Sequence, residues 1–231
     1  MQPTRVNKFV ALANISMSRR AADRAIEMGR IRINGELATP GSLVKENDQV
    51  TIDGRILTTP KQLVTVIFHK PTGYVCSKRG QGNKTIYDLL PESFRSLNPV
   101  GRLDKDSSGL LLLTNNGQLA QELTHPSSEK KKVYEIKLNK ALSPKDFEKI
   151  TKLGVLLGDG LSKFDVHSTN NLSPNSTFGN PAYEVSMSEG RNRQIRRTFQ
   201  ALDYKVTRIH RTQFGKYVIR NLKESAYKIV G

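Results

Sequence analysis

The residues best suited to chemistry lie in a short loop that precedes a run of leucines. Asp104 and Asp106, with Arg102 beside them, come just before the four consecutive leucines at 110–113. Such a short apolar run, followed by a turn signal, is typical of a buried strand. A carboxylate on a loop fixed by this strand can act as a nucleophile or stabilise positive charge in a substrate. The alternative is an ordinary polar turn whose aspartates make Asx-type hydrogen bonds.

A second chemically suggestive group is the basic segment that begins at Arg191. From Arg191 to Arg220 the chain carries nine lysines and arginines and one acidic residue, Asp203. An arginine from this segment could keep a buried carboxylate ionised, because its guanidinium is always charged and presents a planar fork. A solvated basic helix that binds phosphate without specificity is the alternative explanation.

Composition narrows the classes of partner. The chain has 231 residues, and its 37 Lys+Arg against 21 Asp+Glu give a formal net charge of +16. This surplus indicates a polyanionic partner, with nucleic acid ahead of a membrane surface. No apolar stretch approaches the length of a membrane span, and the N-terminus lacks the apolar core of a signal peptide. With a single cysteine, Cys76, the chain predicts no internal disulfide, and a cytoplasmic location is expected. No His/Cys cluster has metal-ligand spacing.

The first 60 residues are predicted to form a small separate unit. Its expected helices cover 6–13 and 19–28, the second capped by Ser18 and ended by Gly29. Strand-like pieces follow at 30–33 and 49–52. On the second helix the apolar residues can form one buried side. The other side then carries Arg19, Arg20 and Arg24, which for an isolated helix would be an ordinary solvated face.

The remaining residues, 61–231, are predicted to form a larger unit. Helices are expected at 118–123, at 143–153 and from about 194, and the Ser- and Asn-rich stretch 161–181 is expected to be a long loop or an irregular hairpin. Tyr134 lies in an alternating strand and taken alone is a core aromatic. The expected strands cover 64–69, 75–77, 110–113, 133–138, 182–187, 204–209 and 212–219.

Several of these segments together resemble one enzyme family. Gly-Arg-Leu-Asp at 101–104, followed by SGLLLLTNNG at 108–117, resembles the signature loop of the RNA pseudouridine synthases. Within that family it is most similar to the RsuA-like branch, which carries an S4 domain and modifies bacterial ribosomal RNA. The Lys-x-Tyr element at 132–134 and Gln-Ile-Arg at 194–196 resemble two further family motifs. The two helices and following hairpin in residues 5–54 resemble an S4 RNA-binding domain.

The resemblance implies an α+β fold, with an S4 domain at 1–60 and a catalytic domain at 61–231 built on a largely antiparallel mixed sheet. It implies that Asp104 is the catalytic carboxylate, that Tyr134 lies over the target base, and that Arg196 pairs with Asp104. No cofactor or metal is expected, since nothing is oxidised and no group is imported. The partner would be RNA, most simply ribosomal RNA with transfer RNA as a further candidate, and the chain would act as a monomer. The expected substrate-binding residues are Arg102, Lys132, Arg193, Gln194, Ile195, Arg19, Arg20 and Arg24.

Two other functions remain open at this stage. One is a ribosome-associated S4-type binding factor without catalysis, against which the joint presence of Asp104, Tyr134 and Arg196 argues. The other is a glycoside hydrolase, which normally uses two carboxylates flanking the bond. Asp106 could supply the second carboxylate, but the basic charge and the S4-like unit fit RNA better.

Overall fold

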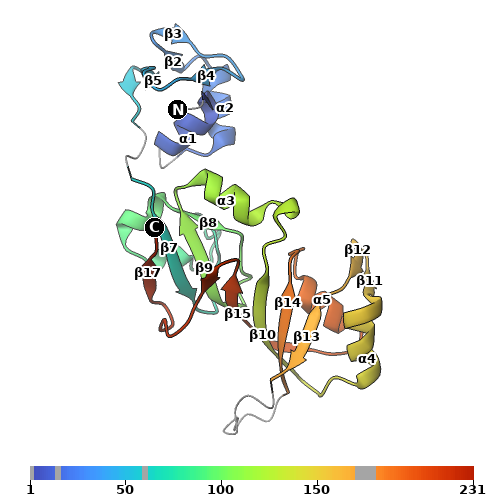
Figure 1. Cartoon of the computed structure of the whole chain (residues 1–231). Coiled ribbons are helices and arrows are strands. Elements are labelled where there is room, and N and C mark those ends of the chain that lie inside the picture. The colour runs from blue at the N-terminus through green and yellow to red at the C-terminus, as the bar shows by residue number, and fades with distance from the viewer. Residues whose placement is uncertain (1–2, 14–16, 59–61, 170–180) are drawn as a thin grey trace. The chain divides into compact units, whose positions relative to one another are not determined.

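The computed structural model describes residues 3–13, 17–58, 62–169 and 181–231 (Figure 1). The chain divides into two compact units, Met1–Leu63 and Val64–Gly231. The boundary predicted at residue 60 falls in 59–61, outside the described residues. Each unit has its own hydrophobic core.

The N-terminal unit packs two helices on small sheets. Ser18 caps the second helix as expected, because its hydroxyl accepts a hydrogen bond from the Ala21 amide at 3.2 Å. Val10, Ala22 and Ile31 are among the fully buried core residues. One sheet has the order β3-β2-β5-β6, and β1 pairs with β4. The elements are α1 (Val6–Ala13), α2 (Arg19–Glu27), β1 (Thr4–Arg5), β2 (Ile31–Ile33), β3 (Glu36–Leu37), β4 (Leu43–Val44), β5 (Val50–Ile52) and β6 (Arg55–Ile56).

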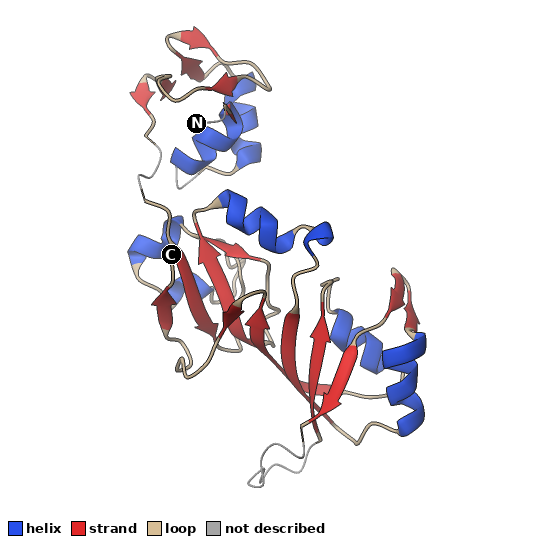
Figure 2. Cartoon of the chain, in the orientation of Figure 1, coloured by secondary structure: helices blue, strands red, loops and turns tan. Residues whose placement is uncertain are grey.

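The C-terminal unit is built on one mixed sheet, which has nine strands among the described residues (Figure 2). The strand order is β13-β14-β10-β15-β9-β7-β17, with β16 paired to β15 and β8 paired to β9. The pairing of β15 with β9 is parallel, and the other pairings in this sheet are antiparallel. The strands are β7 (Thr65–Lys70), β8 (Asn98–Val100), β9 (Ser108–Thr114), β10 (Lys132–Leu138), β13 (Asp165–Ser168), β14 (Ala182–Met187), β15 (Val206–Phe214), β16 (Tyr217–Val218) and β17 (Tyr227–Ile229).

The leucine run forms a buried strand of this sheet, as predicted. Every residue of β9 is buried. Because side chains alternate across a strand, Leu111 and Leu113 pack in one hydrophobic cluster, whereas Leu110 and Leu112 pack in another on the opposite face. The strand is thus buried on both sides, and the loop that leads into it has a rigid end.

Helices pack on both faces of the sheet. Leu123 of α3 packs in the cluster of Leu110 and Leu112, and Phe199 of α5 packs in the cluster on the opposite face. The predicted helix at 143–153 exists, but it changes from α4 to a π-helical turn at Lys149. The hairpin β11–β12 pairs on its own. These elements are α3 (Gly117–Thr124), α4 (Pro144–Glu148), α5 (Gln194–Gln200), the π-helical turn Lys149–Leu153, β11 (Val155–Leu157), β12 (Gly160–Ser162) and the 3₁₀ turns Ile86–Asp88, Glu92–Ser96 and Pro126–Ser128.

One of the sequence predictions is wrong and another is confirmed in one of its two forms. The stretch 161–181 was expected to be a long loop or an irregular hairpin, and the structure has a hairpin, in which the edge strand β13 pairs antiparallel with the next strand, β14. The strand β12 covers the start of this stretch. Phe164 and Val166 are buried there, and they anchor this polar segment. Residues 170–180 lie outside the described part. The strand expected at 75–77 is reduced to an isolated bridge between Val75 and Thr85, and β17 was not anticipated.

Candidate active-site cleft

The aspartate loop connects β8 to β9 and is closed on itself by a turn. Gly101 begins it with φ of +68°, a left-handed conformation that favours glycine. The Ser107 amide donates to the Asp104 carbonyl at 3.1 Å, which completes the turn. The Asp104 side chain is 35% exposed, so its carboxylate is partly shielded and still reachable.

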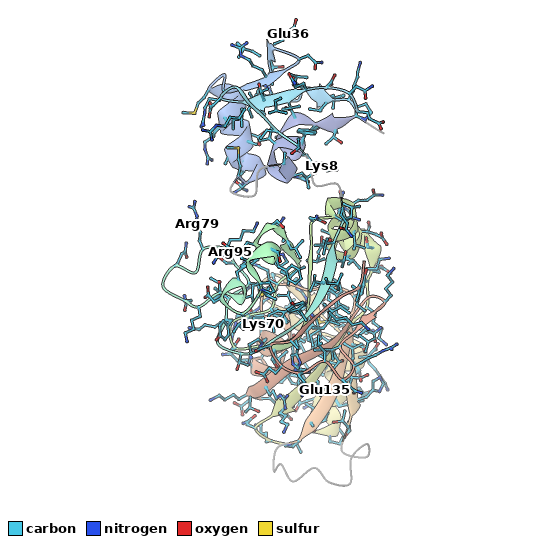
Figure 3. The ribbon with its side chains drawn as sticks, turned by 90° about the vertical axis from the view of Figure 1, so that its left-hand side faces the viewer. Lys8, Glu36, Lys70, Arg79, Arg95 and Glu135 are labelled. Atoms are coloured by element: carbon cyan, nitrogen blue, oxygen red, sulfur yellow. The ribbon has the colours of Figure 1, made fainter. Side chains whose placement is uncertain are left out.

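A fully buried lysine, Lys70, binds the main chain of this loop. Lys70, at the end of β7, is 0% exposed, and its ammonium donates to the carbonyls of Pro71 (2.9 Å), Asp104 (3.1 Å) and Ser107 (2.7 Å). Figure 3 shows Lys70 inside the unit, while Arg79 and Arg95 point outward. Burial lowers the pKa of Lys70, and the nearby negative charges of Asp104 and Asp106 oppose that shift.

The segment that follows Lys70 also donates hydrogen bonds to the aspartate loop. The Gly73 amide donates to the Lys105 carbonyl at 2.7 Å. The Cys76 thiol donates to the Leu103 carbonyl at 3.3 Å, and burial raises the pKa of that thiol. The segment 70–76 is therefore the support of the aspartate loop, a role that the sequence analysis did not assign to Lys70.

The ion pairs of the two aspartates differ from the predicted arrangement. Arg193 lies 3.4 Å from a carboxylate oxygen of Asp104 and 3.2 Å from one of Asp106. Arg196 instead lies 3.1 Å from the Asp106 carboxylate, and it donates to the main-chain carbonyls of Asp106 and Val206 at 3.1 and 2.8 Å. The expected direct pair of Arg196 with Asp104 is therefore wrong for this structure, and Arg193 is the arginine that contacts Asp104.

Arg193 and Arg196 differ in how far their side chains are buried. The Arg196 side chain is 13% exposed, whereas that of Arg193 is 44% exposed. Burial lowers the pKa of Arg196, against the charge of Asp106. Burial raises the pKa of Asp106, but the hydrogen bond from Arg193 and the charges of Arg196 and Arg193 outweigh it, so the net shift is downward. Asp106 is the ionised link between the loop and α5.

The start of α5 fixes these arginines by side-chain hydrogen bonds. Arg193 precedes the helix in a left-handed conformation, with φ of 47°. Gln194 is buried, and its side chain accepts from the Arg191 amide at 3.1 Å and donates to Ser162 at 3.1 Å and to Glu189. Ile195 is buried in the main core of the unit. Gln194 and Ile195 thus orient the helix.

One cleft of about 1010 Å³ brings the predicted residues of this unit together. Tyr134, on β10, is buried with the core and lines the cleft. Lys132, at the start of the same strand, donates to the Ser188 carbonyl at 2.6 Å. The catalytic and substrate-binding residues that the family resemblance implied for this unit all line the cleft: Arg102, Asp104, Lys132, Tyr134, Arg193, Gln194, Ile195 and Arg196. Asp106 does not line it. Three helix arginines of the other unit, Arg19, Arg20 and Arg24, are exposed on α2.

Arg211, on β15, also lines the cleft and was not among the predicted site residues. It is 2% exposed. A single arginine in a basic segment gives no signal of burial, so only the fold could identify it. Within the described residues, no group of three or more His, Cys, Asp or Glu side chains is placed to hold a metal ion. No described helix is long and apolar enough to cross a membrane.

Comparison with known proteins gives the family context. A sequence model described as RNA pseudouridylate synthase matches residues 64–201, and one described as S4 domain matches residues 4–50. Ribosomal large subunit pseudouridine synthase B of Bacillus subtilis (strain 168) is 32% identical over 220 residues, which are 94% of this chain and 88% of that protein. The protein of the same name from Xylella fastidiosa (strain Temecula1 / ATCC 700964) is 34% identical over 93% of this chain but 46% of its own length.

The chain spans about half the length of several curated relatives that it matches. A relative from Rickettsia felis, called an uncharacterized RNA pseudouridine synthase, is 31% identical over 97% of this chain and 95% of that protein. Among solved structures, one described as a crystal structure of pseudouridylate synthase has a TM-score of 0.67 and 28% identity. It aligns over 98% of this chain and 96% of its own.

Proposed function

We propose, because this chain belongs to the RNA pseudouridylate synthase family and carries an S4 domain, that it isomerises a specific uridine of large-subunit ribosomal RNA to pseudouridine. The observation that carries this proposal is the convergence of Asp104, Tyr134 and the arginines of α5 in one cleft. The reaction would take place in the cytoplasm, where bacterial ribosomal RNA is found.

The proposed reaction needs only groups that the cleft contains. The bond between N1 of uracil and C1′ of the ribose breaks, the base turns, and a bond forms between C5 and C1′. The proton lost from C5 is balanced by the hydrogen gained at N1, so the reaction is an isomerisation without cofactor or metal. Asp104 supplies the carboxylate, as a nucleophile or as the charge that stabilises the sugar cation. Its partial exposure leaves it accessible to a nucleotide that enters the cleft.

The cation that contacts the Asp104 carboxylate in this structure is Arg193. Its guanidinium contacts both Asp104 and Asp106, while the more buried Arg196 anchors Asp106. We therefore assign Arg193 to the carboxylate directly and Arg196 to the geometry of the loop. This division modifies the role that the family resemblance implied for Arg196.

RNA binding must supply the free energy that exposes the target base. Extruding a nucleotide from its stack costs a few kcal/mol, and stacking on an aromatic such as Tyr134 can return about 1–3 kcal/mol. The remainder is assigned to phosphate contacts made by the cations of the cleft and by Arg19, Arg20 and Arg24 of the S4 domain. The net charge of +16 is consistent with steeply salt-dependent binding.

The decisive experiment is pseudouridine mapping on bacterial ribosomal RNA that lacks the modification, with wild-type protein and with Asp104→Asn. We expect one new modified uridine with the wild type and none with the variant, while the two bind RNA with the same affinity. This result would establish the reaction, the target and the carboxylate together. If wild-type protein modified no uridine in free ribosomal RNA, in ribosomal subunits or in transfer RNA, the chain would be an RNA-binding factor without catalysis.

A further inference from the structure

Among the residues that the structure describes, Arg211 is a buried cation without a carboxylate partner, and it lines the proposed active site. Its Nε donates to the Leu110 carbonyl at 2.8 Å. Its Nη2 is buried and has no hydrogen-bond partner within the described residues. Burying a guanidinium that is not neutralised destabilises a protein. A fold that retains such a group at a ligand cleft suggests that the ligand supplies the missing partner.

A second cation, Lys132, lies close to the same aromatic ring as Arg211. The Arg211 guanidinium carbon lies 5.0 Å from the centre of the Phe214 ring, and the Lys132 ammonium lies 5.4 Å from the same centre. All three residues line the cleft. Burial lowers the pKa of Lys132, and the charge of Arg211 lowers it further. The two cations therefore repel each other in the free protein, and an anion between them would relieve that repulsion.

The position of Arg211 in the sheet connects this corner to the chemistry. In the register of β15 with β10, Arg211 is opposite Tyr134, and in the parallel register with β9 it is opposite Gly109. A Cβ on Gly109 would overlap the backbone of Arg211, so only glycine permits this close approach of the two strands. Arg211 consequently lies between β10, which carries Tyr134, and β9, which begins where the aspartate loop ends.

The carboxylates of this part of the cleft already have cationic partners. Glu189, whose charge opposes the lowering of the Lys132 pKa, is paired with Arg191. Asp104 and Asp106 are paired with Arg193 and Arg196. Within the described residues, Arg211 takes part in no ion pair. A guanidinium with free donors matches the geometry of a phosphate, and RNA presents a phosphodiester at every nucleotide.

We propose that Arg211 and Lys132, arranged around Phe214, form a subsite for one phosphodiester next to the nucleotide whose base is in the cleft. This inference rests on the proposed function, because it assumes an RNA nucleotide between Asp104 and Tyr134. It adds two binding groups with a defined target, a single linkage beside the reactive uridine. The subsite would fix the ribose against Asp104 while the base turns.

A thermodynamic cycle between protein and RNA tests the subsite. The probes are 12-nucleotide RNAs with one central uridine, either unmodified or with a neutral methylphosphonate linkage on its 5′ or its 3′ side. Binding is measured for wild type, Arg211→Gln, Arg211→Lys and the control Arg208→Gln. Arg208 lies on the same strand, is exposed and does not line the cleft, so its substitution removes the same charge without touching the subsite.

The expected result is a coupling confined to one linkage and to Arg211. Neutralising that linkage should weaken wild-type and Arg208→Gln binding about tenfold and leave Arg211→Gln binding nearly unchanged. In the unmodified RNA, Arg211→Gln should reduce the slope of log affinity against log salt by about 1. Thermal unfolding identifies a misfolded variant, and Arg211→Lys, which keeps the charge and loses the fork, provides a second folded comparison.

Two outcomes would overturn the inference. One is the absence of coupling at both linkages in a folded Arg211 variant. The other is the same coupling for Arg208→Gln, which would mean that general charge and not the subsite is responsible. Because the readout is binding, it is independent of turnover. Failure of wild-type protein to form pseudouridine in the mapping experiment would refute the proposed function and leave the coupling result to be judged separately.

Discussion

Replacing Lys70 with methionine should loosen the aspartate loop while leaving the rest of the core in place. Methionine keeps most of the volume of the buried stem and removes the ammonium that binds the carbonyls of Pro71, Asp104 and Ser107. Hydrogen bonds from a charged donor contribute ~1.5–3 kcal/mol each, so three contribute roughly 5–9 kcal/mol before any cost is counted. Burying the ammonium costs several kcal/mol of that gain. The net loss in the free energy of unfolding should therefore be about 2–4 kcal/mol.

The catalytic effect of Lys70→Met should exceed what lost stability explains. A misplacement of the carboxylate by ~1 Å can cost ~10²-fold in rate, so single-turnover formation of pseudouridine should fall by about that factor under conditions where the variant is folded. Denaturant unfolding and single-turnover assays measure the two effects. The stability control is Lys105→Met in the same loop, where the lysine is exposed and the change should stay within about 0.5 kcal/mol. A Lys70→Met protein with wild-type unfolding midpoint and rate would refute the support role.

Two further predictions follow from other contacts. Arg196→Gln should destabilise the fold by about 1–3 kcal/mol, because the side chain is mostly buried and binds two carbonyls as well as Asp106. Arg193→Gln should change the stability by less than about 1 kcal/mol and should instead lower the turnover rate. Equal stability losses of the two variants in denaturant unfolding would contradict this division of roles. Burial, followed by the charges of His69 and Arg208, lowers the pKa of His210 to about 4, so the folded state prefers the neutral ring. The contribution of His210 to the unfolding free energy should then be fully present above pH 6.5, and the unfolding free energy should fall by at most about 3 kcal/mol toward pH 4. His210→Gln should make the unfolding free energy depend less steeply on pH. An equally steep pH dependence in urea titrations of the variant would count against this prediction.

The central parts of the fold could be predicted because each of them depends on residues that are close together in the sequence. Four leucines next to a turn signal can satisfy both faces of a buried strand, and β9 is buried on both faces. Ser18 and Gly29 bracket α2 because capping depends on a few neighbouring residues. For the stretch 161–181 the sequence left a loop and an irregular hairpin open, because its polar residues are compatible with both. The pairing of β13 with β14 shows that the hairpin is formed.

The sequence predicted which motif residues lie at the site, but it did not predict which of them form ion pairs with one another. Every catalytic or substrate-binding residue that the family resemblance implied for the C-terminal unit lines the cleft. The sequence did not determine which arginine contacts which aspartate, because Arg193 and Arg196 are one helical turn apart and either could reach the loop. The conformation of Arg193 before the helix and the two carbonyls bound by Arg196 decide the matter. The burial of Lys70 was hidden for a related reason, since it depends on the way the aspartate loop folds over β7.

The cleft shows how a strongly basic chain can use its charge at one site. In the described part of the chain, three buried side-chain nitrogens have no hydrogen-bond partner, and they belong to Arg191, Arg196 and Arg211, all of which line the cleft. A buried donor without a partner destabilises the free protein. For Arg191 and Arg196 the unpartnered atom is Nε, and their other nitrogens form ion pairs with Asp159, Glu189 and Asp106. Arg211 forms no ion pair among the described residues, so an anion in the cleft would offset more of the cost of burying Arg211 than of burying the other two.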